Sequence, residues 1–318
     1  MSGGAQAAAP GRELRVQVTP PWPFKLAPGF FFDGLVQFRG GVLSRLIHLP
    51  ADGQVPRGGL GILADGDLIP VHLRVAQLGG GDLIIGARAE SQAASSEAIR
   101  RIRRALAVDL DLRPFHVRFR DDPWIGRAVR AQPELRPAGR PLAFESLAWA
   151  VTEQLIEYRR AAAIQRRMIA VLGRHDAPSG LRDSPSAARF AATAPARLEA
   201  MDLSRGRALA LVRVAREVAA GRVDLDSADP SEQERGWRRL RKIPEIGTWT
   251  TEILACQGQG RLDQLPAGDL GFIKLVGRRL SGGDPRAYAT EEQVRAAFER
   301  FGEWKALAAA YALRAGER

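Results

Sequence analysis

The sequence predicts an α+β protein, in which an N-terminal antiparallel sheet with packing helices is followed by an all-helical bundle. Three observations lead to this prediction. Short apolar or alternating runs, separated by turns that contain glycine, fill the first third of the chain. Beyond Pro141, apolar residues recur at the spacing of helices. Between these parts, residues 121–140 are rich in Arg, Pro and Gly, which is typical of a connecting segment.

The first third has the pattern of strands joined by hairpins. Gly40-Gly41 and Asp52-Gly53 have the composition of hairpin turns. We expect the strands at residues 14–18, 35–38, 43–49, 71–75 and 82–85. A helix should follow, because Ala98, Ile102 and Ala105 share one face.

These patterns also predict how the chain is divided. We expect one short helix around residues 124–131 in the connecting segment. The predicted parts are a flexible N-terminus (1–11), a sheet-rich domain (12–120), a linker (121–140) and a helical domain (141–318).

Composition narrows the function without fixing it. The chain has 318 residues and a formal net charge of +11, which favours contact with polyanions such as nucleic acid. Nearly all of the basic residues are arginine, and a GC-rich genome also produces such an excess of arginine over lysine. No apolar run is long enough to span a membrane, and the first residues do not resemble a secretion signal. These absences and the single cysteine, Cys256, together predict a location in the cytoplasm. One cysteine is also too few to hold an iron–sulfur cluster.

The most informative stretch runs from Leu240 to Glu252. Ser231 and Glu234 have the spacing of a capping box, which predicts a helix from there to about Lys242. Residues 244–247 then predict a tight turn, and Thr248 is placed to cap a second helix. Such a turn leaves backbone N–H groups at the start of the second helix free for a phosphate. A DNA backbone is held in this way without readout of its sequence.

Here the chain resembles the helix-hairpin-helix DNA glycosylase superfamily, and within it the DNA-3-methyladenine glycosylase II family. The hairpin that carries the resemblance is Ile243-Pro244-Glu245-Ile246-Gly247-Thr248-Trp249-Thr250-Thr251. A second match is the loop Leu265-Pro266-Ala267-Gly268-Asp269-Leu270-Gly271, which is similar to the family's Pro-x-x-Asp-Leu-Gly loop. Residues 144–163, 203–208 and the pair Trp304-Lys305 also match, so the resemblance covers about residues 141–311.

The resemblance implies a helix-hairpin-helix glycosylase bundle that removes alkylated bases of the 3-methyladenine type from double-stranded DNA. Asp269 matches the family's catalytic aspartate, which stabilises positive charge on the sugar as the base leaves. Relatives that also cut the strand have a lysine where this chain has Trp249, so a monofunctional enzyme is expected. The enzyme should act as a monomer on DNA, without membrane contact.

The resemblance also assigns the remaining site residues. Leu155 matches the apolar wedge that fills the space of a flipped base. Trp249 and Trp304 match the aromatic walls of the base pocket, and Ile253 stands where the family often has tyrosine. The hairpin residues 243–248 would bind phosphate: Ile243, Pro244, Glu245, Ile246, Gly247 and Thr248. No cofactor is required, but Na⁺ or K⁺ is a candidate ligand of the main-chain carbonyls of Arg241, Ile243 and Ile246.

One acidic residue departs from the family's pattern, and a second lies near the expected DNA face. Glu245 stands where the family has the first hairpin glycine, a residue that tolerates unusual dihedral angles. Glu153 adds a second negative charge near the expected DNA face. We expect both carboxylates to weaken DNA binding.

Other interpretations of the same residues stay open. Asp269 has the sequence context of an ordinary helix N-cap. Leu155 is also the last member of an apolar stripe, and either tryptophan is also a candidate for core packing. For the whole chain, the alternatives are a non-catalytic DNA-binding protein, a glycosylase for a deaminated or oxidised base, and a structural protein that does not bind DNA.

Overall fold

The computed structural model describes residues 13–27, 33–137 and 139–316, so the predicted flexible N-terminus (1–11) lies outside the described residues. The predicted antiparallel sheet is present, with strand order β1-β5-β4-β3-β2. At the β2–β3 hairpin, Gly40 and Gly41 both have positive φ, as the predicted two-residue turn requires. The strands are β1(Glu13–Val18), β2(Val36–Arg39), β3(Val42–Pro50), β4(Leu68–Gln77) and β5(Leu83–Arg88).

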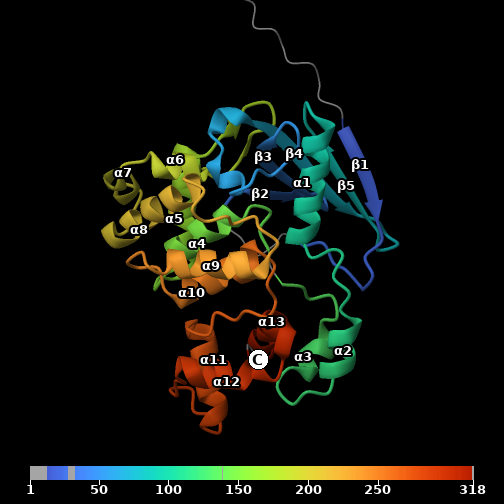
Figure 1. The fold of residues 1–318 in the computed structure, drawn as a ribbon. Coiled ribbons are helices and arrows are strands. Elements are labelled where there is room, and N and C mark those ends of the chain that lie inside the picture. The colour runs from blue at the N-terminus through green and yellow to red at the C-terminus, as the bar shows by residue number, and fades with distance from the viewer. Residues whose placement is uncertain (1–12, 28–32, 138, 317–318) are drawn as a thin grey trace, which may run out of the picture.

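The helix α1(Gln92–Ala105) covers one face of this sheet (Figure 1). Ser91 caps it by accepting a hydrogen bond from the N–H of Ala94. Ala94, Ala98 and Ile102 are buried against the inward side chains of β3, β4 and β5. The period-two pattern of the strands and the helical stripe of α1 therefore meet in one apolar layer.

The rest of the chain is mainly helical. Short 3₁₀ turns occur at η1(Leu60–Ile62), η2(Asp65–Asp67) and η4(Gly302–Trp304), and η3(Leu254–Gly258) is a π-helical turn. A small hairpin of β6(His175–Asp176) and β7(Leu181–Arg182) interrupts the helices. None of the described helices is long and apolar enough to cross a membrane. The helices are α2(Arg113–Phe119), α3(Gly126–Ala131), α4(Ala143–Glu153), α5(Tyr158–Leu172), α6(Ala187–Ala191), α7(Pro195–Glu199), α8(Arg205–Ala219), α9(Pro230–Leu240), α10(Thr248–Ile253), α11(Leu270–Leu280), α12(Glu291–Glu299) and α13(Lys305–Gly316).

These helices bury two separate apolar clusters. The first lies among α4 to α10 and is centred on residues such as Leu147 and Leu211. The second joins α11, α12 and α13 with α2 and α3, which come from much earlier in the chain (Figure 1). Phe115 and Phe119 therefore pack with the C-terminal helices rather than with the sheet. The division into domains at 120 and 140 stays a prediction.

The start of α9 differs from the prediction. Asp229, not Ser231, is the N-cap, and its carboxylate accepts a hydrogen bond from the N–H of Ser231. Pro230 takes the first helical position, which suits a residue with fixed φ and no N–H to satisfy. The capping box predicted for Ser231 and Glu234 is wrong, but the predicted helix is present and ends at Leu240, two residues before Lys242.

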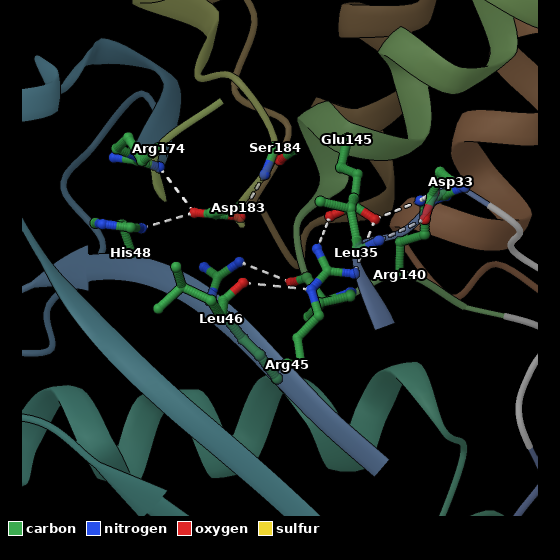
Figure 2. Close-up of polar contacts among 12 residues, drawn as sticks. Asp33, Leu35, Arg45, Leu46, His48, Arg140, Glu145, Arg174, Asp183 and Ser184 are labelled. Carbon is green, nitrogen blue, oxygen red and sulfur yellow. Dashed lines mark hydrogen bonds and ion pairs between the residues drawn. The ribbon is translucent and has the colours of Figure 1, made fainter. Parts of the chain in front are cut away.

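A buried ionic cluster, which we call the junction, joins the sheet to α4. It consists of Asp33, Arg45, Arg140 and Glu145 (Figure 2). Both arginines bond the carboxylate of Glu145, and Arg140 also bonds Asp33 at 2.8 Å. The four side chains are at most 4% exposed. Two positive and two negative charges thus compensate one another where α4 begins, as buried charges require.

Candidate active site

The turn between α9 and α10 has the expected position, and its apolar side chains anchor it to the protein. The N–H of Ile246 donates to the carbonyl of Ile243 at 3.0 Å, and Ile246 itself is only 4% exposed. Thr248 was predicted to cap the second helix, but α10 begins at Thr248, and its N-cap is Gly247 in an extended conformation. No side chain in the described chain caps α10. Its first N–H groups are therefore available to an anion from outside.

Glu245 adopts the backbone conformation for which the matching glycine is suited. Its φ is +72°, in the left-handed region that favours glycine. Its carboxylate lies against the first turn of α8: a Cβ built on Gly206 would be 3.1 Å from its Oε1. Arg207 lies in the field of the same carboxylate. A helix N-terminus and a nearby arginine both stabilise negative charge, so part of this charge is compensated within the protein.

The turn between α4 and α5 places Leu155 in solvent. Its side chain is 102% exposed and its φ is +52°, so it is not part of the core. The alternative that Leu155 is an ordinary core leucine is therefore wrong. The preceding residue, Gln154, donates from Nε2 to the carbonyl of Glu245 at 2.6 Å and to Thr250 Oγ1 at 2.8 Å. This side chain ties the Leu155 turn to the α9–α10 turn.

Asp269 lies at the start of α11, after a loop whose first residues, 265–267, are buried. Leu265 is 3% exposed and Ala267 is fully buried. Asp269 is the N-cap of α11: its Oδ1 accepts a hydrogen bond from the N–H of Gly271 at 2.8 Å. Its Oδ2 receives no hydrogen bond from the described residues, and the side chain is half-buried. The N-cap role is thus present, and it leaves one carboxylate oxygen for a substrate.

A buried carboxylate supports this loop from behind. Glu252 on α10 is 5% exposed, and the nearby backbone N–H of Ala267 helps to lower the pKa of its carboxyl group. Arg295 on α12 bridges Glu252 at 2.7 Å and Glu291 at 2.5 Å. Burial raises the pKa of Glu252, and the bond from Arg295 opposes that rise. The Asp269 loop therefore lies against an ion-paired cluster that links α10 to α12.

The predicted pocket residues have different environments. Trp249 is half-buried and lies against the Asp269 loop. Its Cβ is 3.9 Å from the position that a Cβ would occupy at Gly268. Trp304 is also half-buried and packs on Phe115, with 5.8 Å between ring centroids. Ile253 is only 6% exposed. The structure therefore brings Trp249 beside Asp269, whereas the pocket roles of Trp304 and Ile253 stay predictions.

Glu153, the last residue of α4, carries a feature that the sequence interpretation missed. Burial raises the pKa of Glu153 to about 7, a hydrogen bond with the Trp149 side chain lowers it, and the charge of Asp269 raises it. Arg140 also acts on it and favours the charged form. The sequence suggested only a repulsive charge near DNA. The signal was its place two residues before Leu155, but burial could not be foreseen from one sequence.

No model of a known protein family matches the chain. The chain is 29% identical to DNA-3-methyladenine glycosylase 2 of Escherichia coli over 185 residues, which are 58% of this chain and 61% of that protein. The match thus spans less than two thirds of that relative. The fold is that of the 3-methyladenine DNA-glycosylase from Archaeoglobus fulgidus (TM-score 0.71, 20% identity, 94% of this chain and 97% of the other).

A further solved structure has a similar fold over part of the chain. It is the 3-methyladenine DNA glycosylase of Schizosaccharomyces pombe in complex with abasic DNA (TM-score 0.51, 23% identity, 63% of this chain and 94% of the other). The match to the Escherichia coli protein and the shared fold support the resemblance found in the sequence.

Proposed function

We propose that this chain, a relative of DNA-3-methyladenine glycosylase 2, is a monofunctional DNA glycosylase that flips alkylated bases out of duplex DNA and hydrolyses their bond to deoxyribose. The observation that carries the proposal is the link through Gln154. It joins the exposed Leu155 turn to the α9–α10 turn. The second helix of that turn also carries Trp249, which lies against the Asp269 loop.

The α9–α10 turn serves as the helix-hairpin-helix that holds the DNA backbone. Its free N–H groups at the start of α10 suit one phosphate, and such contacts position DNA without reading sequence. Leu155 enters the base stack in place of the flipped nucleotide. Because its side chain is already in solvent, insertion between bases buries apolar surface that the free protein leaves exposed.

Asp269 supplies the charge for the chemical step. As the bond between C1′ and the base nitrogen breaks, its electron pair leaves with the base and positive charge develops on the sugar. The free oxygen of Asp269 stabilises that charge and orients water, which adds to C1′ and releases a proton. A base alkylated at N3 or N7 is cationic, so it leaves as a neutral molecule. Trp249 occupies the position where relatives that also cut the strand have a lysine, so the product is an intact strand with an abasic site.

Several finer features belong to the same proposal. We infer a monomer that works in the cytoplasm on nucleoid DNA and needs no cofactor. Na⁺ or K⁺ would be held by the carbonyls of Arg241, Ile243 and Ile246. Neutral carbonyl oxygens suit such ions, although the Ile243 carbonyl also closes the turn. The ion would stiffen the turn and take no part in bond cleavage.

The test compares base release by wild type with release by Asp269→Asn. Duplex DNA methylated at purines is incubated with each protein, and free base is measured. Asparagine keeps the helix cap but lacks the charge, so we expect release to fall by at least about a hundredfold with DNA affinity retained. The matched control is Asp229→Asn, which makes the same change at the N-cap of α9.

The outcomes separate the competing functions. Release by wild type and by Asp229→Asn, with loss in Asp269→Asn, supports the glycosylase. Strands should break only after alkali treatment; breakage without alkali contradicts the monofunctional assignment. If all three proteins bind DNA and none releases base, the chain is a non-catalytic DNA-binding protein.

A further inference from the structure

We propose that Glu153 is a proton donor to uncharged bases, which extends this site to lesions that cannot leave without protonation. This inference rests on the proposed glycosylase function. The chemistry at Asp269 removes a cationic base without an acid, whereas an uncharged deaminated or oxidised purine is a poor leaving group. Removal of such a base needs a second group in its acid form close to the reacting sugar.

The position of Glu153 fits that role. It ends α4, directly before Gln154, whose side chain holds the α9–α10 turn, and two residues before the exposed Leu155. The wedge occupies the space that a flipped base vacates. A carboxyl group two residues from the wedge therefore lies close to the strand from which the base is flipped. The negative charge of Asp269 raises the pKa of Glu153, so the two carboxyl groups lie near enough to interact.

The surroundings of Glu153 favour the acid form near neutral pH. Three groups act on it: Trp149 from its own helix, Asp269 from the start of α11, and Arg140 from the segment before α4. Arg140 is largely compensated, because it bonds Asp33 and Glu145 in the junction. Burial and Asp269 therefore outweigh Arg140, and the pKa of Glu153 is raised to about 7.

The two carboxyl groups then have separate tasks. Glu153 gives its proton to an oxygen or nitrogen of the base while the bond from C1′ to the base breaks and its electron pair leaves with the base. Water adds to C1′ opposite the leaving group, beside the ionised Asp269, and its proton is lost to solvent. Glu153 regains a proton from solvent after the base departs. Two carboxyl groups with different protonation states are the usual arrangement for splitting a glycosidic bond.

The experiment uses the full-length protein and two duplex oligonucleotides, one with a single 7-methylguanine and one with a single hypoxanthine. The measured quantity is the ratio of the single-turnover rate on hypoxanthine to the rate on 7-methylguanine. In Glu153→Gln the ratio should fall by about a hundredfold, the usual contribution of a general acid. Glu157→Gln, the same change at an exposed glutamate four residues later, should keep the wild-type ratio.

The pH profile of wild type tests the inference without a variant. Below pH 7 Glu153 is mostly protonated, so hypoxanthine release at subsaturating protein should be level there and fall about tenfold per pH unit well above 7. Release of 7-methylguanine should not follow this fall. Parallel profiles for the two bases, or an unchanged ratio in Glu153→Gln, would overturn the inference.

Failure of this inference is distinct from failure of the proposed function. If wild type releases 7-methylguanine but no hypoxanthine at any pH, Glu153 is not a proton donor and the glycosylase assignment stands. If wild type releases neither base, the proposed function itself fails and the inference fails with it.

Discussion

The two ends of α4 differ in whether the carboxylate that they bury is paired with arginine. At its start, Glu145 is buried and bonded by two arginines in the junction. At its end, Glu153 is half-buried and forms no ion pair with the residues that the structure describes, and Leu155 is fully exposed with a positive φ. The first end satisfies the ordinary rules for buried charge. At the second end, a partly buried carboxyl group lacks an ion pair and an apolar side chain is exposed to solvent, and both are unfavourable.

From this difference we expect the start of α4 to contribute to stability and its end to contribute to the proposed function. Strained backbone, exposed apolar side chains and incompletely paired carboxyl groups cost free energy, and folded proteins keep them mainly where they act on a ligand. The junction shows that this chain does pair its buried charges where only structure is at stake. A variant at the start of α4 should therefore change the free energy of unfolding, and a variant at its end should change base release.

The largest expected effect is at the start of the helix. Glu145→Ala leaves Arg45 and Arg140 buried without their shared partner, so the free energy of unfolding should fall by about 3–5 kcal/mol. Urea unfolding followed by circular dichroism measures this. Asp109→Ala breaks the exposed pair with Arg103 and should cost no more than about 1 kcal/mol. Equal losses in the two variants would mean that the junction is not specially stabilising.

An intermediate effect is expected at Leu155. Leu155→Ala removes apolar surface that is already in solvent, so stability should stay within about 0.5 kcal/mol of wild type. Base release should fall at least about tenfold, because the flipped state loses its wedge. Leu147→Ala, in the buried part of the preceding helix α4, should instead lower the free energy of unfolding by about 2–5 kcal/mol. Normal base release by Leu155→Ala would contradict the wedge role.

The smallest expected effect is at Glu245. Glu245→Gly relieves a positive φ and should stabilise the protein by up to about 1 kcal/mol, with a few-fold gain in DNA affinity from the lost charge. Glu245→Gln keeps the strained backbone, so it should share the gain in affinity and not the gain in stability. Fluorescence anisotropy with labelled duplex DNA and thermal unfolding measure the two quantities. A loss of stability in Glu245→Gly would show that the contact with α8 outweighs the strain.

Much of the fold was predictable because it follows from local patterns. Alternating residues gave the five strands, Gly40-Gly41 gave a hairpin turn, and the motif around Gly247 located the α9–α10 turn. The packing of Phe115 with the C-terminal helices was not predictable, because it joins segments far apart in the sequence. The caps at Asp229 and Gly247 were missed because neighbouring Ser231 and Thr248 fit the same cap preferences.

The sequence motifs located the loop and the turn that carry the candidate site residues, but not the surroundings of those residues. The loop motif located Asp269, but that Glu252 and Arg295 hold this loop depends on tertiary contacts. Glu153 was visible as a charge near DNA. Its raised pKa arises from burial and from Asp269, which is more than a hundred residues away in the sequence.

The bonds from Gln154 have a consequence for how such a protein would search DNA. They fix the separation between the α9–α10 turn and the turn that carries Leu155 before any DNA is bound. Under the proposed function, binding of the α9–α10 turn to a phosphate would place Leu155 against one base step, with little conformational entropy lost in positioning it. The protein would then test base steps at a fixed distance from the bound phosphate: a well-stacked step would resist the insertion of Leu155, and a step with weakened stacking would admit it.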